Sequence, residues 1–442
     1  MGLVSQCRGW MAATIVALFC TALISGQTAK PPSSPQRKAG AEEAPAARIP
    51  VGPLGFVAPN PAYLNLKLSF NSLDFIDSRH LLFTFHVNTL LQRIPGDPPD
   101  DDDQMIHAVV LDIKTGRVLR QAGWRMHDRG RYLWALRDGT FLVRERNSLF
   151  LTDRTLQLRP YLTFDTDLQG VEVSPGRGLL MLEVKKYLPP KKNEAEGDGA
   201  TNPPPSLLGA PTETQRARTQ MVLVRPGDRK GLGQAEFLNP ADVPLVENGL
   251  LDVDAGKKRD DWVIKRETLD RSTEVVGTVQ SSCTPHLVSL SDDVVLSQNC
   301  PKRGGTGTLV TALSLNGKVL WDGIWDSKYV WGLFESSQDG RRFAYESLEM
   351  NRQLGSMDAF GESDVIAQVA GVFDTQTGAL VLAKDASPIL SAGQNFALSA
   401  DGRRFAILRD GAIEVYDLPP VAMNQGEGAR EKGKVQRGKR KK

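Results

Sequence analysis

The sequence has few of the residues that carry catalytic and metal-binding chemistry. Only four cysteines and five histidines occur among its 442 residues. The histidines have no metal-ligand spacing and are interpreted as structural or surface residues: His80, His86, His107, His127 and His286. HExxH, GxSxG, Walker A and GxGxxG motifs are missing. The sequence therefore gives no sign of a zinc protease, a serine hydrolase or a nucleotide-binding enzyme, although a catalytic set assembled from distant loops stays open.

A strong net charge and long apolar runs are also missing. The formal net charge is only +2, so no whole-protein argument for nucleic-acid binding follows. The apolar run Trp10–Ile24 follows Arg8 and precedes Ser25, and it is shorter than the roughly 20 residues of a membrane span. We predict a secretory signal peptide over residues 1–26 and an exported protein of the periplasm or the cell exterior. The alternative to this cleaved leader is a lipid anchor attached at Cys20.

Removal of this leader leaves two cysteines, Cys283 and Cys300, an even number in an oxidising compartment. They flank an expected hairpin whose turn lies between Ser291 and Asp292. A two-residue turn there places the two cysteines opposite each other, close enough for a disulfide. Such a bond stabilises the fold by about 3 kcal/mol in the chain-entropy model. The alternative, a redox-active dithiol, lacks the usual CxxC spacing.

Long helical periodicity is nearly missing, and short apolar runs separated by Gly, Asp, Asn and Ser take its place. The hexapeptide DGRRFA occurs twice, at Asp339–Ala344 and Asp401–Ala406, each time after a serine-containing turn. A second signature, a strand, a Thr-Gly turn and a strand, occurs near Leu111 and Phe373. One copy of each signature gives four antiparallel strands. The sequence therefore predicts an all-β protein built as a β-propeller.

Grouping the two signatures predicts seven blades, with eight compact blades as the alternative. The predicted blades are 73–128, 129–166, 167–240, 241–281, 282–327, 328–391 and 392–418. The last blade has only about three strands of its own, and we expect Leu64–Phe70 to close it as an N-terminal outer strand. The remaining domains are a Pro-rich flexible leader (27–61), the propeller (62–420) with exposed loop insertions at 95–104 and 189–218, and a disordered basic tail (421–442).

The tail concentrates charge. Residues 421–442 hold eight Lys and Arg against two Glu, a net charge of +6. A solvated, solubilising end is the first interpretation; contact with anionic lipid, polysaccharide or nucleic acid is the second.

The repeats also resemble known propellers. The Ser-x-Asp-Gly turns at Ser337 and Ser399 resemble the repeats of WD40-like and TolB-like bacterial propellers, and Thr311–Trp321 resembles the tryptophan-docking repeat of quinoprotein-type propellers. The resemblance covers the body of the chain and implies blades rather than one activity, because many unrelated functions use the same blades.

Candidate site residues are few. Asp252, Asp254 and Asp260 occupy positions 1, 3 and 9 of a calcium-loop pattern, but Gly256 and Lys257 depart from it, so an ordinary turn is the first interpretation. The acidic run 100–103 is likewise expected to be a solvated loop. We expect core packing for the tryptophans Trp124, Trp134, Trp262, Trp321, Trp325 and Trp331.

The predicted function is a secreted, non-enzymatic, monomeric binding scaffold. It holds a protein or glycan partner on one propeller face, without specific nucleic-acid binding and without a cofactor. The alternative is a propeller enzyme of quinoprotein, lactonase or lyase type, with calcium or pyrroloquinoline quinone in the central channel.

Overall fold

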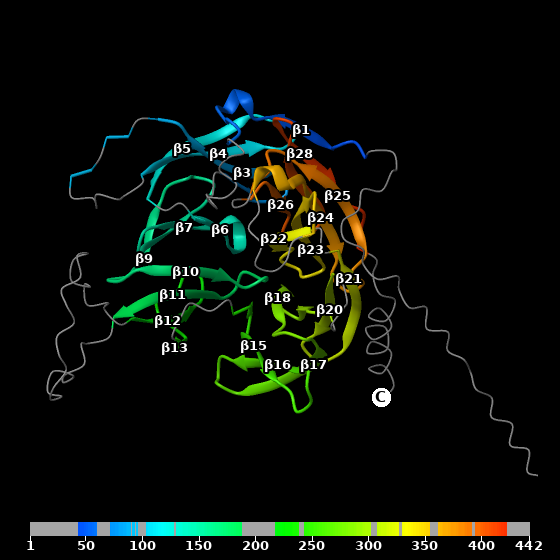
Figure 1. Cartoon of the computed structure of the whole chain (residues 1–442). Coiled ribbons are helices and arrows are strands. Elements are labelled where there is room, and N and C mark those ends of the chain that lie inside the picture. The colour runs from blue at the N-terminus through cyan, green and yellow to red at the C-terminus, as the bar shows by residue number, and fades with distance from the viewer. Residues whose placement is uncertain are drawn as a thin grey trace, which may run out of the picture. The chain divides into compact units, whose positions relative to one another are not determined.

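A computed structural model describes most of the chain between residues 43 and 421. The described residues are 43–59, 71–89, 91–92, 94–95, 103–127, 130–187, 217–237, 243–301, 307–326, 329–353, 361–390 and 394–421. They form seven four-stranded antiparallel sheets arranged in a ring (Figure 1). Helical structure in these residues is limited to three-residue 3-10 turns. The protein is a seven-bladed β-propeller, which confirms the predicted fold class.

Each blade uses consecutive strands of the chain. Blade 1 contains β2 (Asn71–Phe75), β3 (His80–Val87), β4 (Gln104–Asp112) and β5 (Val118–Met126). Blade 2 contains β6 (Leu133–Ala135), β7 (Phe141–Glu145), β8 (Ser148–Thr152) and β9 (Arg159–Thr163). Blade 3 contains β10 (Leu168–Val173), β11 (Leu180–Tyr187), β12 (Ala217–Val224) and β13 (Gly233–Phe237). Blade 4 contains β14 (Leu245–Val246), β15 (Gly249–Ala255), β16 (Asp261–Thr268) and β17 (Thr273–Gln280).

The second half of the ring follows the same rule until its last strand. Blade 5 contains β18 (His286–Ser291), β19 (Val294–Asn299), β20 (Thr308–Ser314) and β21 (Val319–Trp325). Blade 6 contains β22 (Tyr329–Ser336), β23 (Arg342–Met350), β24 (Val365–Asp374) and β25 (Leu380–Ala386). Blade 7 contains β26 (Phe396–Leu398), β27 (Arg404–Arg409) and β28 (Ala412–Asp417), and the N-terminal strand β1 (Ala47–Pro50) completes it.

The closing strand is not the one expected. β1 pairs with β28 in the register Ala47↔Val415 to Pro50↔Ala412, and it lies inside the segment predicted to be a leader. Leu64–Phe70 lies outside the described residues, as do the predicted signal peptide and most of the predicted basic tail. An N-terminal strand thus closes the last blade as predicted, but the choice of strand was wrong.

Apolar side chains fill the spaces between neighbouring blades. Seven buried clusters occur in the described chain, each shared by two adjacent sheets. The cluster between blades 7 and 1 includes Ile49 of β1 and Phe83 and Phe85 of β3. Burial of these faces is the main favourable contribution to the ring.

The repeated Ser-x-Asp-Gly turns have one geometry. In blade 7, Ser399 Oγ donates to Asp401 Oδ1 at 2.7 Å, and Asp401 Oδ1 also accepts the Arg403 N–H at 3.1 Å. Gly402 has φ 62°, a left-handed conformation that favours glycine. The turn at Ser337 in blade 6 repeats these bonds at 2.7 and 3.1 Å. Side chains of the repeat therefore fix the backbone where the first strand of a blade turns into the second.

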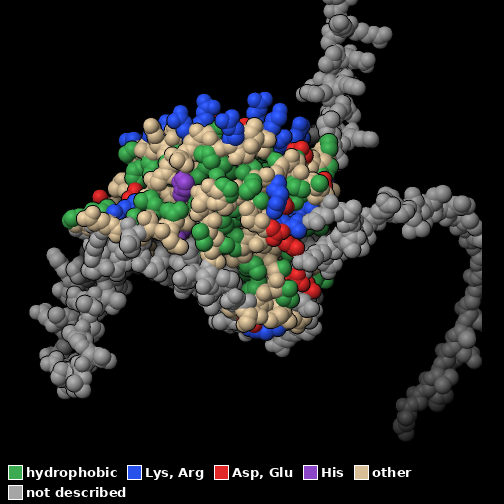
Figure 2. Space-filling view, turned by 90° about the horizontal axis from the view of Figure 1, so that it is seen from above, with side chains coloured by type: hydrophobic (Ala, Val, Ile, Leu, Met, Phe, Trp, Pro, Cys, Tyr) green, Lys and Arg blue, Asp and Glu red, His purple; other side chains and the backbone are tan. Residues whose placement is uncertain are grey.

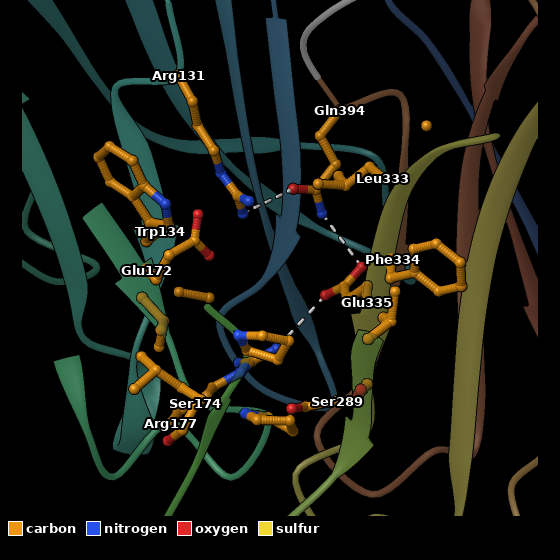
Figure 3. A pocket seen from close by; sticks show the side chains of 18 of the residues that line it. Arg131, Trp134, Glu172, Ser174, Arg177, Ser289, Leu333, Phe334, Glu335 and Gln394 are labelled. Atoms are coloured by element: carbon orange, nitrogen blue, oxygen red, sulfur yellow. Dashed lines mark hydrogen bonds and ion pairs between the residues drawn. The ribbon is translucent and has the colours of Figure 1, made fainter. Parts of the chain in front are cut away.

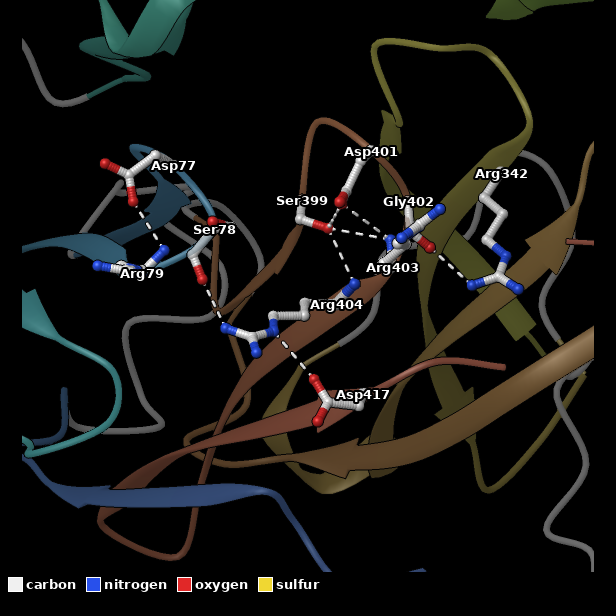
Figure 4. Close-up of polar contacts among 10 residues, drawn as sticks. All are labelled: Asp77, Ser78, Arg79, Arg342, Ser399, Asp401, Gly402, Arg403, Arg404 and Asp417. Carbon is white, nitrogen blue, oxygen red and sulfur yellow. Dashed lines mark hydrogen bonds and ion pairs between the residues drawn. The ribbon is translucent and has the colours of Figure 1, made fainter. Parts of the chain in front are cut away.

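The last arginine of each DGRR motif joins one blade to the next. Arg342 of blade 6 donates through Nη1 to the Gly402 carbonyl in the blade 7 turn at 2.6 Å, and through Nη2 to the Pro419 carbonyl. Arg404 of blade 7 donates to the Ser78 carbonyl in the blade 1 turn (Figure 4). The repeated motif is therefore an inter-blade connection as well as a turn.

A disulfide joins Cys283 and Cys300, with their Cα atoms 5.6 Å apart, which confirms the predicted pairing. The turn of the hairpin lies one residue later than expected, at Asp292 and Asp293, because the register shifts between Ser289 and Ser291. The two cysteines lie just beyond the paired ends of β18 and β19.

Candidate functional site

The inner strand of every sheet faces the middle of the ring; these strands are β2, β6, β10, β14, β18, β22 and β26. The structure contains a cavity of about 330 Å3 there (Figures 1 and 3). All seven blades contribute to its wall. Representative lining residues are Asp74, Trp134, Glu172, Leu245, His286, Glu335 and Gln394. We call this space the channel cavity. Charged side chains of both signs line it, which is an unusual composition for the inner strands of a packed domain.

Arg131 enters the channel cavity just before β6. Its Nε donates to the Leu133 carbonyl at 3.1 Å, and its Nη2 lies 3.5 Å from Gln394 Oε1. The guanidinium carbon lies 5.6 Å from the ring centroid of Trp134, whose side chain is buried. Arg131 itself is exposed. The guanidinium is thus oriented on three sides while it stays accessible from the cavity.

Gln394 is the residue that holds Arg131 in place. Its backbone N–H donates to the Asn71 carbonyl at 2.9 Å, and its carbonyl accepts from Asn71 Nδ2 at 3.1 Å. Its Nε2 donates to the Leu73 carbonyl and to Glu335 Oε2, both at 3.1 Å. These bonds join blades 7, 1 and 6, and they leave Gln394 Oε1 directed at the guanidinium (Figure 3).

Glu335 lies opposite Arg131 and has three donors. Arg177 Nη2, Gln394 Nε2 and the Leu398 N–H approach its carboxylate at 3.4, 3.1 and 3.0 Å. Burial nevertheless raises the pKa of Glu335 to about 8, against the opposing effect of Arg177. Burial also raises the pKa of Asp74, whose carboxylate accepts from Ser72 Oγ at 2.8 Å. Both acids are therefore parts of the wall, with their oxygens bonded to neighbouring groups.

Arg177 separates the channel cavity from a second cavity. This second space, of about 750 Å3, lies among the turns that follow β2, β6, β22 and β26, and Arg177 lines both. Arg177 is buried and has φ 59°, a left-handed conformation that is costly for a non-glycine residue. The surrounding fold holds this conformation and directs the side chain at Glu335 (Figure 3).

A third buried acid lies behind the channel wall. Glu346 of β23 accepts from Gln368 Nε2 at 2.9 Å and from the Leu333 N–H at 3.4 Å. Burial raises the pKa of Glu346 to about 8. The group is therefore mainly protonated in the folded protein at neutral pH.

The turns that join the first to the second strand, and the third to the fourth, form one face of the propeller, which we call the turn face. Every blade contributes at least one exposed Lys or Arg to it. These residues are Arg79, Lys114, Arg117, Arg137, Arg154, Arg225, Arg229, Lys230, Arg271, Lys318, Arg341 and Arg403. Figure 2 shows a row of Lys and Arg side chains projecting from one edge of the molecule.

Aspartates on the turn face are held against the backbone. Seven of them accept a hydrogen bond from an N–H of their own turn: Asp77, Asp112, Asp153, Asp270, Asp339, Asp374 and Asp401. Hydrogen bonds from Thr115 hold the pKa of Asp112 below its usual value. These carboxylates thus stabilise the turns by accepting backbone hydrogen bonds, while the longer basic side chains extend outward.

A cavity of about 440 Å3 opens at the turn face between blades 7 and 1. Arg79, Lys114 and Arg404 line it together with Asp112 and Asp417. Arg404 Nε donates to Asp417 Oδ1 at 2.9 Å. The junction that closes the ring is therefore also a place where basic side chains converge.

The structure does not bring the three calcium candidates together. Asp254 pairs with Lys265, and Asp252 Oδ1 accepts the Val253 N–H at 2.7 Å. Asp260 lies in a turn with φ 66°. In the part of the chain that the structure describes, no three Asp, Glu, His or Cys side chains are grouped so as to hold a metal ion.

The tryptophans mostly pack as expected. The side chains of Trp124, Trp134, Trp321 and Trp325 are buried, and Trp262 is half-buried. The indole N–H of Trp321 donates to the Thr375 carbonyl at 3.0 Å, which joins blades 5 and 6. The side chain of Trp331 lies outside the described part of the structure.

No protein-family model and no curated protein matches this sequence. Among solved structures, the chain is similar to an acylaminoacyl peptidase of Pyrococcus horikoshii, with 9% identity, a TM-score of 0.44 and coverage of 85% of this chain and 56% of that chain. A putative TolB from Agrobacterium tumefaciens has 10% identity, a TM-score of 0.37 and coverage of 68% and 95%. A chain of a mitotic checkpoint complex has 10% identity, a TM-score of 0.41 and coverage of 88% and 97%.

These similarities concern the fold alone, as their identities are low. The seven four-stranded sheets themselves establish the propeller fold that the repeats predict. The chain spans little more than half the length of the peptidase. Within the described residues, no helix has the length and apolar character needed to cross a membrane.

Proposed function

We propose that this protein is an exported binding scaffold whose turn face docks an acidic protein partner. The observation that carries the proposal is the arrangement of the charged side chains on that face, where long basic side chains extend from every blade and many of the shorter carboxylates are bonded to the backbone. Exposed Lys and Arg project from all seven blades, whereas seven aspartates are bonded to their own turns. Complementary charge steers such a partner and fixes its orientation. The Cys283–Cys300 disulfide supports export to an oxidising compartment.

The rigidity of the turns supports a protein partner. Arg341 and Arg403 extend from turns that a serine, an aspartate and a left-handed glycine fix, so little backbone entropy is lost on binding. Glycan recognition usually involves stacking on exposed aromatic rings. Here Trp124, Trp134 and Trp325 are buried, which favours a protein over a glycan.

Charge reversal on the turn face tests this proposal, with poly-L-glutamate as the probe. The test variant is Arg79→Glu/Arg341→Glu/Arg403→Glu, in which all three positions are exposed. The matched control reverses three exposed residues on the loop between β15 and β16, Lys257→Glu/Lys258→Glu/Arg259→Glu, and so changes the net charge equally. An exposed ion pair contributes about 0.2–1 kcal/mol, so reversing three charges should cost about 2 kcal/mol, roughly a 30-fold loss of affinity.

Fluorescence anisotropy of labelled poly-L-glutamate at several salt concentrations measures the effect. We expect the turn-face variant to lose affinity and salt dependence while the control binds nearly as the parent does. Equal losses in both variants would contradict a specific turn face. Binding to heparin or to phosphatidylglycerol vesicles, but not to poly-L-glutamate, would contradict a protein partner.

A further inference from the structure

The channel cavity has the features of a binding site for a small molecule, separate from the turn face. Its volume of about 330 Å3 lies at the lower end of the range of small-molecule pockets. A positive and a negative side chain, Arg131 and Glu172, line it, and both are exposed. Figure 3 shows the Glu172 carboxylate directed into the cavity, toward the side from which Arg131 enters.

Arg131 is held in an orientation that suits a ligand with a carboxylate. The groups in direct contact with it are the Leu133 carbonyl, the Gln394 amide oxygen and the face of Trp134, and the carboxylates of Asp74, Glu172 and Glu335 attract its charge. Gln394 is itself fixed by Asn71, Leu73 and Glu335. A guanidinium fixed in this manner suits a carboxylate, whose two oxygens match its planar fork of N–H groups.

Three other charged groups of the cavity, Arg177, Glu335 and Asp74, are bonded to neighbouring side chains. Arg177 and Glu335 are bonded to each other at 3.4 Å, and Asp74 accepts from Ser72. Their relative exposures are low, at 9% for Arg177 and 3% for Asp74. Arg131 and Glu172 line the same cavity and are exposed, so a ligand that enters it can contact both. Groups of opposite charge facing one space complement a ligand that itself carries both charges.

We propose that the channel cavity binds a small zwitterion of amino-acid or dipeptide size, with its carboxylate on Arg131 and its ammonium group on Glu172. Trp134 and Gln394 are positioning residues, because they act by holding the guanidinium. The ligand site and the turn face share no residue, so either proposal can fail without the other.

Ligand binding is tested on the full chain with the twenty common L-amino acids and glycylglycine. A thermal shift selects the best binder, and titration calorimetry gives its affinity. The N-acetyl derivative of that binder lacks the ammonium group, and its amide lacks the carboxylate. We expect both derivatives to bind at least about tenfold more weakly, because each lacks one of the two charged groups that contact the protein.

Variants assign the two charges. Arg131→Gln and Glu172→Gln should each lower the affinity at least about tenfold. Glu172 is exposed, so its variant keeps the test valid if Arg131→Gln fails to fold. Arg259→Gln is the control, since Arg259 is exposed on the loop between β15 and β16 and does not line this cavity. The proposal is wrong if no zwitterion gives saturable binding, if both derivatives bind as well as the parent compound, or if Glu172→Gln leaves the affinity unchanged.

Discussion

Substitution of Arg342 by methionine tests whether the repeated DGRR motif joins neighbouring blades. Arg342 is 2% exposed, and its guanidinium donates to the Gly402 and Pro419 carbonyls of blade 7. A hydrogen bond that involves a charged group contributes about 1.5–3 kcal/mol net. Two such bonds give about 3–6 kcal/mol, and removing a buried charge returns part of its desolvation cost. We therefore expect Arg342→Met to lower the free energy of unfolding by about 3 kcal/mol.

The same motif supplies matched controls. Arg341 is adjacent and exposed, so Arg341→Met should change stability by no more than about 0.5 kcal/mol. Arg404 occupies the equivalent place in the second copy but is half-buried and bonds Ser78 and Asp417, so Arg404→Met should cost about 1 kcal/mol. Urea denaturation followed by tryptophan fluorescence gives the three values. Equal losses for Arg341→Met and Arg342→Met would refute the inter-blade connection.

Three further outcomes are expected. The double variant Cys283→Ser/Cys300→Ser should lower the free energy of unfolding by about 3 kcal/mol, because the disulfide joins residues 17 positions apart in the sequence. Dithiothreitol should lower the melting temperature of the parent protein and leave the melting temperature of the double variant unchanged. Burial raises the pKa of Glu346 to about 8, so the folded protein binds more protons than the unfolded chain between about pH 4.5 and 8. The free energy of unfolding therefore falls as pH rises through this window, by at most about 1.4 kcal/mol per pH unit for this group. Glu346→Gln should flatten the urea midpoint against pH, and an unchanged slope would contradict a protonated Glu346. Deletion of residues 422–442, which hold the eight basic residues of the tail, should weaken poly-L-glutamate binding less than charge reversal on the turn face does. A larger loss of affinity on deletion of the tail would assign the binding to the tail.

Most of the fold could be predicted because each blade leaves a local signal. The Asp-Gly turns and the Thr-Gly turns mark strand boundaries, and the predicted blade limits, such as 282–327, enclose the observed strands β18 to β21. The closing strand left no such signal. Ala47–Pro50 is four residues long and buries only Ile49 deeply, and its proline gives the segment the composition of a linker. A proline is tolerated there because an outer strand has a free edge.

The channel cavity could not be predicted, because its residues meet only when the ring closes. Gln394 of blade 7 is fixed by Asn71 and Leu73 of blade 1, which lie more than 300 positions away, and it bonds Glu335 of blade 6. No spacing in the sequence records these contacts. The sequence did contain one usable sign: Asp74 and Glu335 each stand beside a large apolar residue within an inner strand, β2 or β22. A charge in such a strand is costly unless neighbours bond to it, so its position marks where polar groups of other blades must converge.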